Sequence, residues 1–508
     1  MKRIIFLSAL VYFSINTPAF SQHITYSDIN KEDSKRINFE ILGNFGSNYI
    51  VYKNRNRKHL ITVYDKDMHI TDNVKLDFIS DKTFNVDFIS YPDYFFIVYQ
   101  YQKNNIIYCK AAKMSGSGQL LGEVINLDTT KTNLFTDNKI YYLTNSEDKQ
   151  KILLYKMQHK NDDLSLTAKL FNASMQMLDS TRSMFDYNDR KETYGDLQVA
   201  NDGTYLFSKE TGNGRNDYTR KLEMNYRKPN TTTLITNEIL LDEKYLEDVK
   251  IKIDNLNSQY VITSFSYKKN FGNIEGIFIA VINKENLAVT KKAIALFDDS
   301  IRTKLSDKTN WRTAFNDFAF RNIILKKDGG FLLTTEEYYT QSRSNRYNSR
   351  DYFYNPFFYT PGYYSFQRDY YGYYYRDPYR NSSQDIIYNY NDVLIFSFSN
   401  NLKPEWNNII NKKQSDLETD NYLSFSTLNM GGEIHYLFLQ KDKNKQVLSD
   451  HALQPDGKIK RYPTIKSGEA GYDFMPRLSK QVGARQIIVP CLLHGTIAFA
   501  KIDFSYSP

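Results

Sequence analysis

Cysteine is scarce in this chain. The only two, Cys109 and Cys491, stand among 508 residues, and each sits in an apolar, strand-like run. Buried cysteines in such settings are commonly free thiols, although a disulfide is possible in an oxidising compartment. We expect two buried free thiols, with a disulfide as the open alternative if the fold brings distant segments together.

Long hydrophobic runs are also missing after the N-terminus. Lys2 and Arg3 precede an apolar stretch at 4–15, and Ala19-Phe20-Ser21 has the small-x-small pattern of a cleavage site. This predicts a secretory signal peptide at 1–21, cut before Gln22. Charges interrupt every later apolar run, so no transmembrane segment is expected in the mature chain. No cysteine follows the cleavage site and no C-terminal sorting domain is evident. We therefore expect an exported protein of the periplasm, the outer membrane or the cell surface.

Concentrated charge and catalytic motifs are absent too. Basic and acidic residues alternate along the chain despite the formal net charge of +8, which argues against nucleic acid as a partner. No GxSxG, P-loop, GxGxxG or HExxH pattern occurs, so the sequence predicts no catalytic residue, no cofactor and no metal site. The histidines have no metal-ligand spacing and are expected to be structural or exposed: His23, His59, His69, His159, His435, His451 and His494.

The sequence is rich in short runs of Val, Ile, Tyr, Phe and Thr separated by Gly, Asn and Asp turns, which predicts an all-β fold. One loose unit of four strands recurs. Its very apolar second strand is found eight times, at 48–54, 94–102, 139–145, 204–210, 259–267, 330–339, 434–442 and 486–494. Sequential four-stranded units are typical of a β-propeller.

We therefore predict a single β-propeller domain at 22–508 with eight blades. Seven blades are the alternative if the unit at 139 is irregular, and two separate β domains are the structural rival. The last unit ends without a fourth strand, and the segment 23–29 could supply it from the N-terminus. Such an exchange closes the ring, which protects the faces of the first and last blades.

One segment departs from this pattern. Residues 341–390 interrupt a hairpin between a second and a third strand, and no lysine occurs between Lys327 and Lys403. Tyr and Arg dominate instead, and both offer flat faces with hydrogen-bond donors, as at binding hot spots. The predicted binding residues are Tyr352, Tyr354, Tyr359, Tyr363, Tyr364, Arg368, Tyr370, Tyr371, Tyr373, Tyr374, Tyr375 and Arg376. A low-complexity flap without a ligand is the alternative interpretation.

The residues after this insertion carry a resemblance. Together with "DGG" at 328–330, the run from 391 to 440 resembles a pattern of uncharacterised secreted β-propeller-like proteins of Bacteroidota. The matching residues are Asp328, Gly329, Gly330, Asp392, Trp406, Ile410, Lys413, Gln414, Tyr422, Ser424 and Phe425. The turn at 400–404 departs from the usual Asp-Gly. The resemblance implies an exported propeller of a bacterium and implies no reaction. Trp406 and Gln414 could look like site residues, but packing of the Trp between blades is preferred.

Two functions fit these features. The first is a non-enzymatic binding or scaffold protein of the bacterial envelope, which contacts a protein or glycan partner through the aromatic loop. The second is a hydrolase or lyase that acts on polysaccharide or peptide at the channel of the propeller. Convergent Asp, Glu or His side chains at the channel mouth would favour the second.

Overall fold

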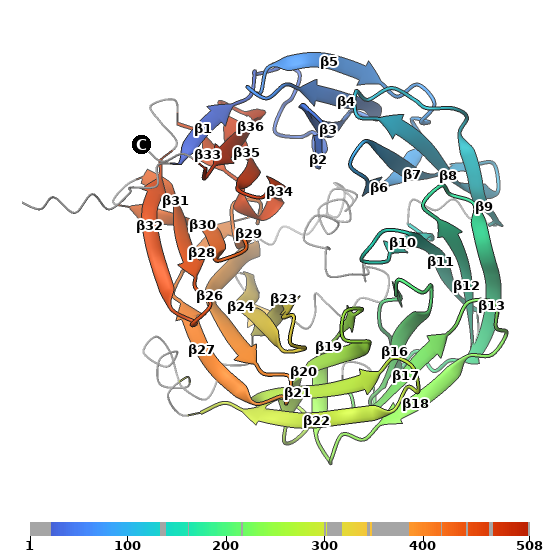
Figure 1. Cartoon of the computed structure of the whole chain (residues 1–508). Helices are drawn as coiled ribbons and strands as arrows, with labels where there is room; N and C mark the ends of the chain where they lie inside the picture. The colour runs from blue at the N-terminus through green and yellow to red at the C-terminus, as the bar shows by residue number, and fades with distance from the viewer. Residues whose placement is uncertain are drawn as a thin grey trace, which may run out of the picture.

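The computed structural model describes residues 22–132, 139–160, 162–214, 217–298, 301, 317–342, 346–347, 386–417, 419–442, 445–466 and 471–505. Eight antiparallel sheets surround a central axis, one after another in chain order (Figure 1). The chain is an eight-bladed β-propeller, so the prediction of an all-β fold with eight blades is confirmed. Apart from the short 3-10 helix η1 (Pro476–Leu478), the elements bounded in the described residues are strands.

Blades 1 to 3 follow the predicted four-strand plan, with the first strand innermost and the last outermost, and in blade 4 two short strands, β14 and β15, share the innermost position. Blade 1 contains β2 (Asn38–Phe45), β3 (Asn48–Arg55), β4 (Lys58–Tyr64) and β5 (Ile70–Lys75), and blade 2 contains β6 (Thr83–Ser90), β7 (Tyr94–Lys103), β8 (Ile106–Ser115) and β9 (Ile125–Lys131). Blade 3 contains β10 (Tyr142–Asn145), β11 (Lys151–Lys160), β12 (Asp163–Asn172) and β13 (Met177–Asp186). Blade 4 contains β14 (Glu192–Tyr194), β15 (Gln198–Val199), β16 (Tyr205–Thr211), β17 (Lys221–Arg227) and β18 (Ile235–Ile239).

Blades 5 to 8 repeat the plan with additions in blades 6 and 8. Blade 5 contains β19 (Tyr245–Asp254), β20 (Gln259–Tyr267), β21 (Ile274–Asn283) and β22 (Val289–Leu296). Blade 6 contains β23 (Phe318–Leu325), β24 (Phe331–Ser342), β25 (Arg346–Tyr347), β26 (Ile386–Phe398), β27 (Pro404–Ile410) and β28 (Gln414–Leu417). Blade 7 contains β29 (Phe425–Asn429), β30 (Ile434–Asp442), β31 (Lys445–Leu453) and β32 (Ile459–Ile465), and blade 8 contains β33 (Asp473–Phe474), β34 (Lys480–Gly483), β35 (Gln486–Leu493), β36 (Thr496–Asp503) and β1 (His23–Tyr26).

The antiparallel order sorts the connections between two faces of the ring. In each blade the turn from the second to the third strand lies on the same face as the crossover into the next blade. We call this the insertion face, because the predicted Tyr/Arg-rich segment connects β24 to β26 there. The remaining turns lie on the opposite face.

The core is divided among the interfaces between blades. Each pair of neighbouring blades shares a cluster of buried apolar side chains, for example Ile50 and Ile61 of blade 1 with Phe95 and Ile97 of blade 2. The middle strands are buried on both sides, whereas an outer strand such as β13 is not. This explains why the second strands are the most apolar runs in the sequence.

The N-terminus closes the ring, as predicted from the segment 23–29. β1 pairs antiparallel with β36, with His23 opposite Asp503 and Tyr26 opposite Ala500. In Figure 1 the blue β1 lies beside the red strands of blade 8. Blade 8 therefore takes three strand positions from the C-terminus and its outermost strand from the N-terminus.

Blade 3 requires one correction. The run 139–145 was predicted to be a second strand, but its strand β10 is the innermost of the blade, and the second strand is β11. The blade itself is complete, so the seven-blade alternative is wrong.

The two cysteines are buried free thiols, as expected. Cys109 lies in the core between blades 2 and 3, and Cys491 in the core between blades 7 and 8. Burial raises the pKa of both thiols. Among the described residues, no helix is long and apolar enough to cross a membrane.

Candidate functional site

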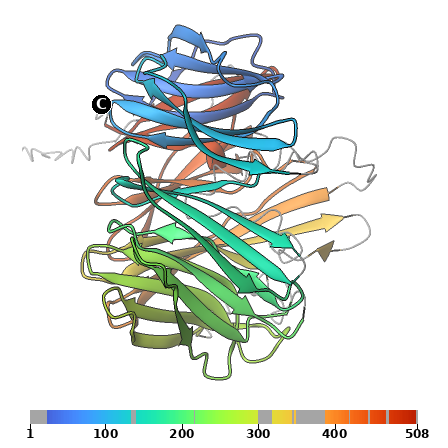
Figure 2. The same cartoon turned by 90° about the vertical axis from the view of Figure 1, so that its right-hand side faces the viewer.

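Blade 6 is longer than its neighbours on the insertion face. β24 and β26 continue pairing past the ordinary end of the blade, to Ser342 opposite Ile386. β25 pairs with this end of β24, and β28 pairs with the start of β26. These strands form a four-stranded blade 6 extension, in the order β25-β24-β26-β28, and its yellow and orange strands reach the right-hand side of the ring in Figure 2.

The extension corrects the boundaries predicted for the insertion. Residues 341–342 and 386–390 were assigned to the loop, but they belong to β24 and β26, and 346–347 form β25. The remaining insertion between the paired strands is 343–385. All twelve predicted binding residues, from Tyr352 to Arg376, lie outside the described residues.

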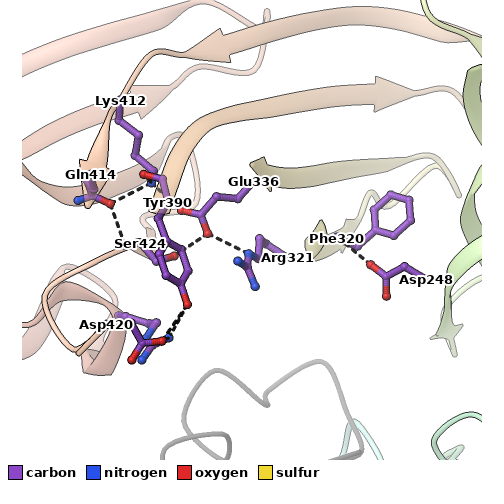
Figure 3. Close-up of polar contacts among 10 residues, drawn as sticks. Asp248, Phe320, Arg321, Glu336, Tyr390, Lys412, Gln414, Asp420 and Ser424 are labelled. Atoms are coloured by element: carbon purple, nitrogen blue, oxygen red, sulfur yellow. Dashed lines mark hydrogen bonds and ion pairs between the residues drawn. The ribbon is translucent and has the colours of Figure 1, made fainter. Parts of the chain in front are cut away.

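A buried carboxylate lies at the base of the extension. Glu336 of β24 is fully buried, and its Oε1 is 2.6 Å from Lys412 Nζ. Its Oε2 accepts hydrogen bonds from Arg321 Nε at 2.9 Å and Ser424 Oγ at 2.7 Å. These side chains come from three parts of the chain that converge on one carboxylate (Figure 3).

Lys412 is surrounded by oxygen. Besides Glu336, its Nζ donates to the carbonyl oxygen of Tyr390 at 3.0 Å and to Gln414 Oε1 at 2.9 Å. An ammonium has three protons to donate, and three oxygens are in place for them. Burial lowers the pKa of Lys412, and the charge of Glu336 opposes that change.

The same group of side chains continues to blades 7 and 8. The Tyr390 hydroxyl donates to Asp420 Oδ2 at 2.9 Å, and Arg477 Nη1 of η1 donates to the same oxygen at 2.6 Å. Gln414 Nε2 donates to the carbonyl oxygen of Leu439 in β30 at 2.9 Å. We name the whole set the hairpin-base cluster: Arg321, Glu336, Tyr390, Lys412, Gln414, Asp420, Ser424 and Arg477.

Two further features fix the geometry of the contacts between blade 6 and its neighbouring blades. Ser424 has a φ of 67°, which is unusual for a residue other than glycine, and its N–H donates to Gln414 Oε1 at 2.8 Å. On the other side, Asp248 of β19 also has a positive φ and accepts a hydrogen bond from Phe320 N of β23 at 3.0 Å (Figure 3). Polar contacts therefore tie blade 6 to blade 5 as well as to blades 7 and 8.

The chemistry of the cluster is that of a structural joint. Its acids are each paired with a cation or a hydroxyl, and Ser424 donates to a carboxylate rather than to a base that could activate it. Buried polar networks of this kind favour one geometry of the groups that they join. The cluster can therefore hold the blade 6 extension in one orientation over the ring.

Sequence reasoning found only part of this cluster. Gln414 and Ser424 appear in the pattern of the resemblance, and Gln414 joins blades 6 and 7 by its hydrogen bonds. Arg321, Glu336, Lys412, Asp420 and Arg477 were missed. The available signal was Glu336 itself, since an acid in the middle of an apolar second strand needs a buried partner.

Trp406 has the packing role that was preferred for it. It lies on β27 among side chains of the core between blades 6 and 7. A Cβ at Gly457, whose φ is 84°, would come within 2.4 Å of Trp406 Cδ2, so the ring lies against the backbone of a blade 7 turn. In the turn at 400–404, where the sequence departs from Asp-Gly, Leu402 supplies the positive φ of 61°.

The histidines lie apart from the hairpin-base cluster. His59 is buried beside the Tyr52 hydroxyl, and His435 Nδ1 is 2.7 Å from the buried carboxylate of Asp450. His69, on an exposed turn, contacts Asp28 at 3.1 Å. In the described ranges no three His, Cys, Asp or Glu side chains gather as a metal site would require.

Another buried acid lies on blade 4. Glu210 of β16 accepts hydrogen bonds from Ser208 Oγ at 3.1 Å and Thr219 Oγ1 at 3.0 Å. Burial raises its pKa from 4.5 to about 7. The folded state therefore holds this proton between pH 4.5 and 7 while the unfolded chain releases it.

Glu210 consequently makes stability depend on pH. Because the folded state binds more protons in this window, the free energy of unfolding falls as the pH rises from 4.5 to 7. We expect Glu210→Gln to unfold like the parent chain at pH 4 and to be more stable at pH 8, by roughly 3 kcal/mol. Urea denaturation at both pH values measures this. Exposed Glu238→Gln is the control, and an equal gain there would contradict the assignment.

Comparisons with known proteins assign no family to this chain. No family model matches the chain, and no curated protein matches it in sequence. Among solved structures, the WD40 domain of SCAP from fission yeast is similar over 96% of this chain and 98% of its own, at 8% identity and a TM-score of 0.40.

Two oligopeptidase structures are also similar. Prolyl oligopeptidase B from Galerina marginata aligns over 91% of this chain and 56% of its own, at 8% identity and a TM-score of 0.41. Oligopeptidase B from Trypanosoma brucei aligns over 84% and 47%, at 10% identity and a TM-score of 0.36. The chain thus spans about half the length of these two proteins.

Proposed function

We propose that this protein is an exported, non-enzymatic binding or scaffold protein of a bacterial envelope. In this proposal the propeller is the platform, and blade 6 presents its insertion to a protein or glycan partner on the insertion face. The observation that carries the proposal is the hairpin-base cluster, which anchors the blade 6 extension to blades 7 and 8 through buried charges.

The energetic cost of burying the charges of the hairpin-base cluster supports a functional role for the blade 6 extension. Burying Glu336, Lys412 and Asp420 removes their hydration, and a joint made of apolar residues would be as stable or more stable. Buried ion pairs have a clearer use in fixing geometry than in adding stability. An extension held in one orientation loses little freedom on binding, which favours affinity.

The composition of the insertion supports a contact surface. Residues 351–380 contain eleven tyrosines and four phenylalanines, and their basic residues are arginines. Tyr and Arg are enriched at binding hot spots, Tyr because it makes large contacts with few rotatable bonds and Arg because its planar guanidinium stacks and donates hydrogen bonds. The secretory signal expected at 1–21 and the resemblance to secreted proteins of Bacteroidota support export.

Removing the insertion tests this proposal. We expect a variant in which Asn-Gly joins Ser342 to Ile386 to keep the thermal midpoint of the parent within about 3 °C, because the pairing of β24 with β26 and the cluster remain and only the two-residue β25 is lost. A photo-crosslinking residue at Tyr371 in the full chain should capture a discrete species in the native envelope. The same residue at Leu256, an exposed position on the opposite face, is the control.

The outcomes separate the two interpretations of the insertion. Capture of the same species from both positions, or of none from Tyr371, would contradict the proposal. Failure of the shortened variant to fold would show that the insertion is part of the structure rather than a presented surface. Intact-mass spectrometry of exported protein should give a chain that begins at Gln22.

A further inference from the structure

A second surface on the insertion face combines an exposed aromatic ring with cations. It lies across two turns, at 217–221 of blade 4 and 267–274 of blade 5. We name it the turn platform: Tyr218, Arg220, Lys268, Lys269 and Phe271. It belongs to neither the blade 6 extension nor the hairpin-base cluster.

Phe271 is the unusual member. Its side chain is 60% exposed, and its φ of 55° places it in the left-handed region that a bulky residue seldom adopts. Strained backbone that presents a large apolar side chain is a pointer to function. The tip of a turn could carry a polar residue or glycine with less strain, so stability alone does not explain a phenylalanine here.

The Phe271 side chain lies beside Tyr218, which other contacts hold in place. Tyr218 lies next to Phe271, with ring centroids 5.8 Å apart, and stacks on Tyr267 at 4.0 Å and 22°. The Tyr218 hydroxyl donates to the carbonyl oxygen of Gly272 at 3.3 Å, and its N–H donates to Asn270 Oδ1 at 3.1 Å. Thr219 and Leu246 exchange two backbone hydrogen bonds across the same blade interface. The platform is therefore organised before any ligand arrives.

The cations around this ring face solvent. Arg220, Lys268 and Lys269 are exposed. Lys221, the next residue, pairs with Glu223 and Glu238, whereas no ion pair joins these three to another residue of the described chain. Unpaired cations beside an exposed aromatic face suit a ligand with negative charge and flat apolar surfaces.

Other turns on the insertion face add to the positive charge. Blade 1 contributes exposed Arg57 and Lys58, and blade 2 contributes exposed Lys103. On the opposite face both signs stand side by side, as in Asp65-Lys66-Asp67 and Glu147-Asp148-Lys149. The insertion face also carries acids, such as exposed Asp162 and Asp163 of blade 3, so its positive charge is concentrated at particular turns.

We propose that the turn platform is a binding subsite for an acidic polysaccharide. The apolar face of a sugar ring would stack on Phe271, while its carboxylate or sulfate groups would contact Arg220, Lys268 and Lys269. A flat membrane surface fits less well, because the blade 6 extension projects from the same face and would hold a bilayer away from these turns. An acidic peptide would satisfy the cations but offers no regular series of ring faces.

This inference rests on the proposed binding function and names a ligand class for its surface. The test uses the purified mature chain with polygalacturonate and chondroitin sulfate as acidic probes, neutral dextran as the uncharged probe, and polyglutamate as an acid without sugar rings. Isothermal titration at two salt concentrations measures each affinity. We expect binding of at least one acidic polysaccharide, weakened by salt, and much weaker binding of dextran and polyglutamate.

Variants of the platform assign the site. Phe271→Ala should weaken binding about tenfold while Phe271→Tyr retains it, and Leu256→Ala, exposed at 72% on the opposite face of the same blade, should have no effect. Replacing Arg220, Lys268 and Lys269 by alanine should weaken binding at least about tenfold and flatten its salt dependence. The charge-matched control replaces Lys66, Lys327 and Lys403, which are exposed on the opposite face.

Several results would overturn the inference. These are no binding of either acidic polysaccharide, equal binding of polyglutamate, or an equal loss in the platform and control triple variants. Each leaves the photo-crosslinking result at Tyr371 untouched, so failure of this subsite is distinguishable from failure of the proposed function. Each variant is first compared with the parent by circular dichroism and thermal midpoint.

Discussion

Replacing Glu336 by alanine is expected to lower the free energy of unfolding by about 3 to 5 kcal/mol. The change leaves Lys412 and Arg321 without their shared carboxylate, and the Lys412 side chain is only 1% exposed. An uncompensated buried cation is costly because it has lost its hydration. Urea denaturation followed by circular dichroism measures the effect.

The control is another glutamate of blade 6. Glu405 pairs with Lys326 at 2.5 Å, but its side chain is 38% exposed, so Glu405→Ala should cost less than about 1 kcal/mol. The double variant Glu336→Leu with Lys412→Met should recover much of the loss, since it removes both buried charges. An effect of Glu336→Ala no larger than that of Glu405→Ala would contradict the role assigned to the hairpin-base cluster.

Asp33→Ala, at the closure of the ring, is also expected to lower the free energy of unfolding by about 3 to 5 kcal/mol. Asp33 lies between β1 and β2, where its carboxylate is 2.7 Å from the fully buried Lys53 Nζ and accepts a hydrogen bond from Arg55 Nε at 2.6 Å. Its carbonyl oxygen accepts from Ile497 N of β36 at 2.7 Å. Burial lowers the pKa of Lys53 to about 8, and Asp33 opposes that change.

The preceding residue supplies the comparison. Glu32 contacts the same Arg55, but its side chain is 76% exposed, so Glu32→Ala should change the free energy of unfolding by less than about 1 kcal/mol. Thermal and urea unfolding of the two variants are measured together. Equal effects of the two substitutions would show that the contact with Lys53 does not secure the closure.

The propeller architecture could be predicted because the apolar pattern of each second strand is a local feature of the sequence. A second strand such as 94–102 is buried on both sides, so it is apolar throughout and easy to find. Blade 3 misled the prediction because its true second strand, β11, carries lysines at both ends, while 139–145 is rich in Tyr, Ile and Leu. Composition also misled the prediction at 386–390. These residues belong to β26, but they stand at the end of a segment whose Tyr/Arg-rich composition predicted a loop.

The hairpin-base cluster could not be predicted, because its contacts are not local. Glu336 and Lys412 are separated by the whole insertion, and Arg477 belongs to blade 8. The turn platform was missed for a related reason. Its residues stand in two turns, one of blade 4 and one of blade 5, which only the fold brings together.

The pairing of β1 with β36 also has a consequence for the order of folding. The outermost strand of blade 8 is the first described strand of the chain, and its partner is the last. A chain that enters its compartment from the N-terminus must keep β1 unpaired until nearly all the rest has followed. Ring closure is then the contact with the greatest separation in sequence, and contacts of that kind form slowly. Refolding should therefore show blade formation first and protection of the β1 amides last, an order that pulsed hydrogen exchange can resolve.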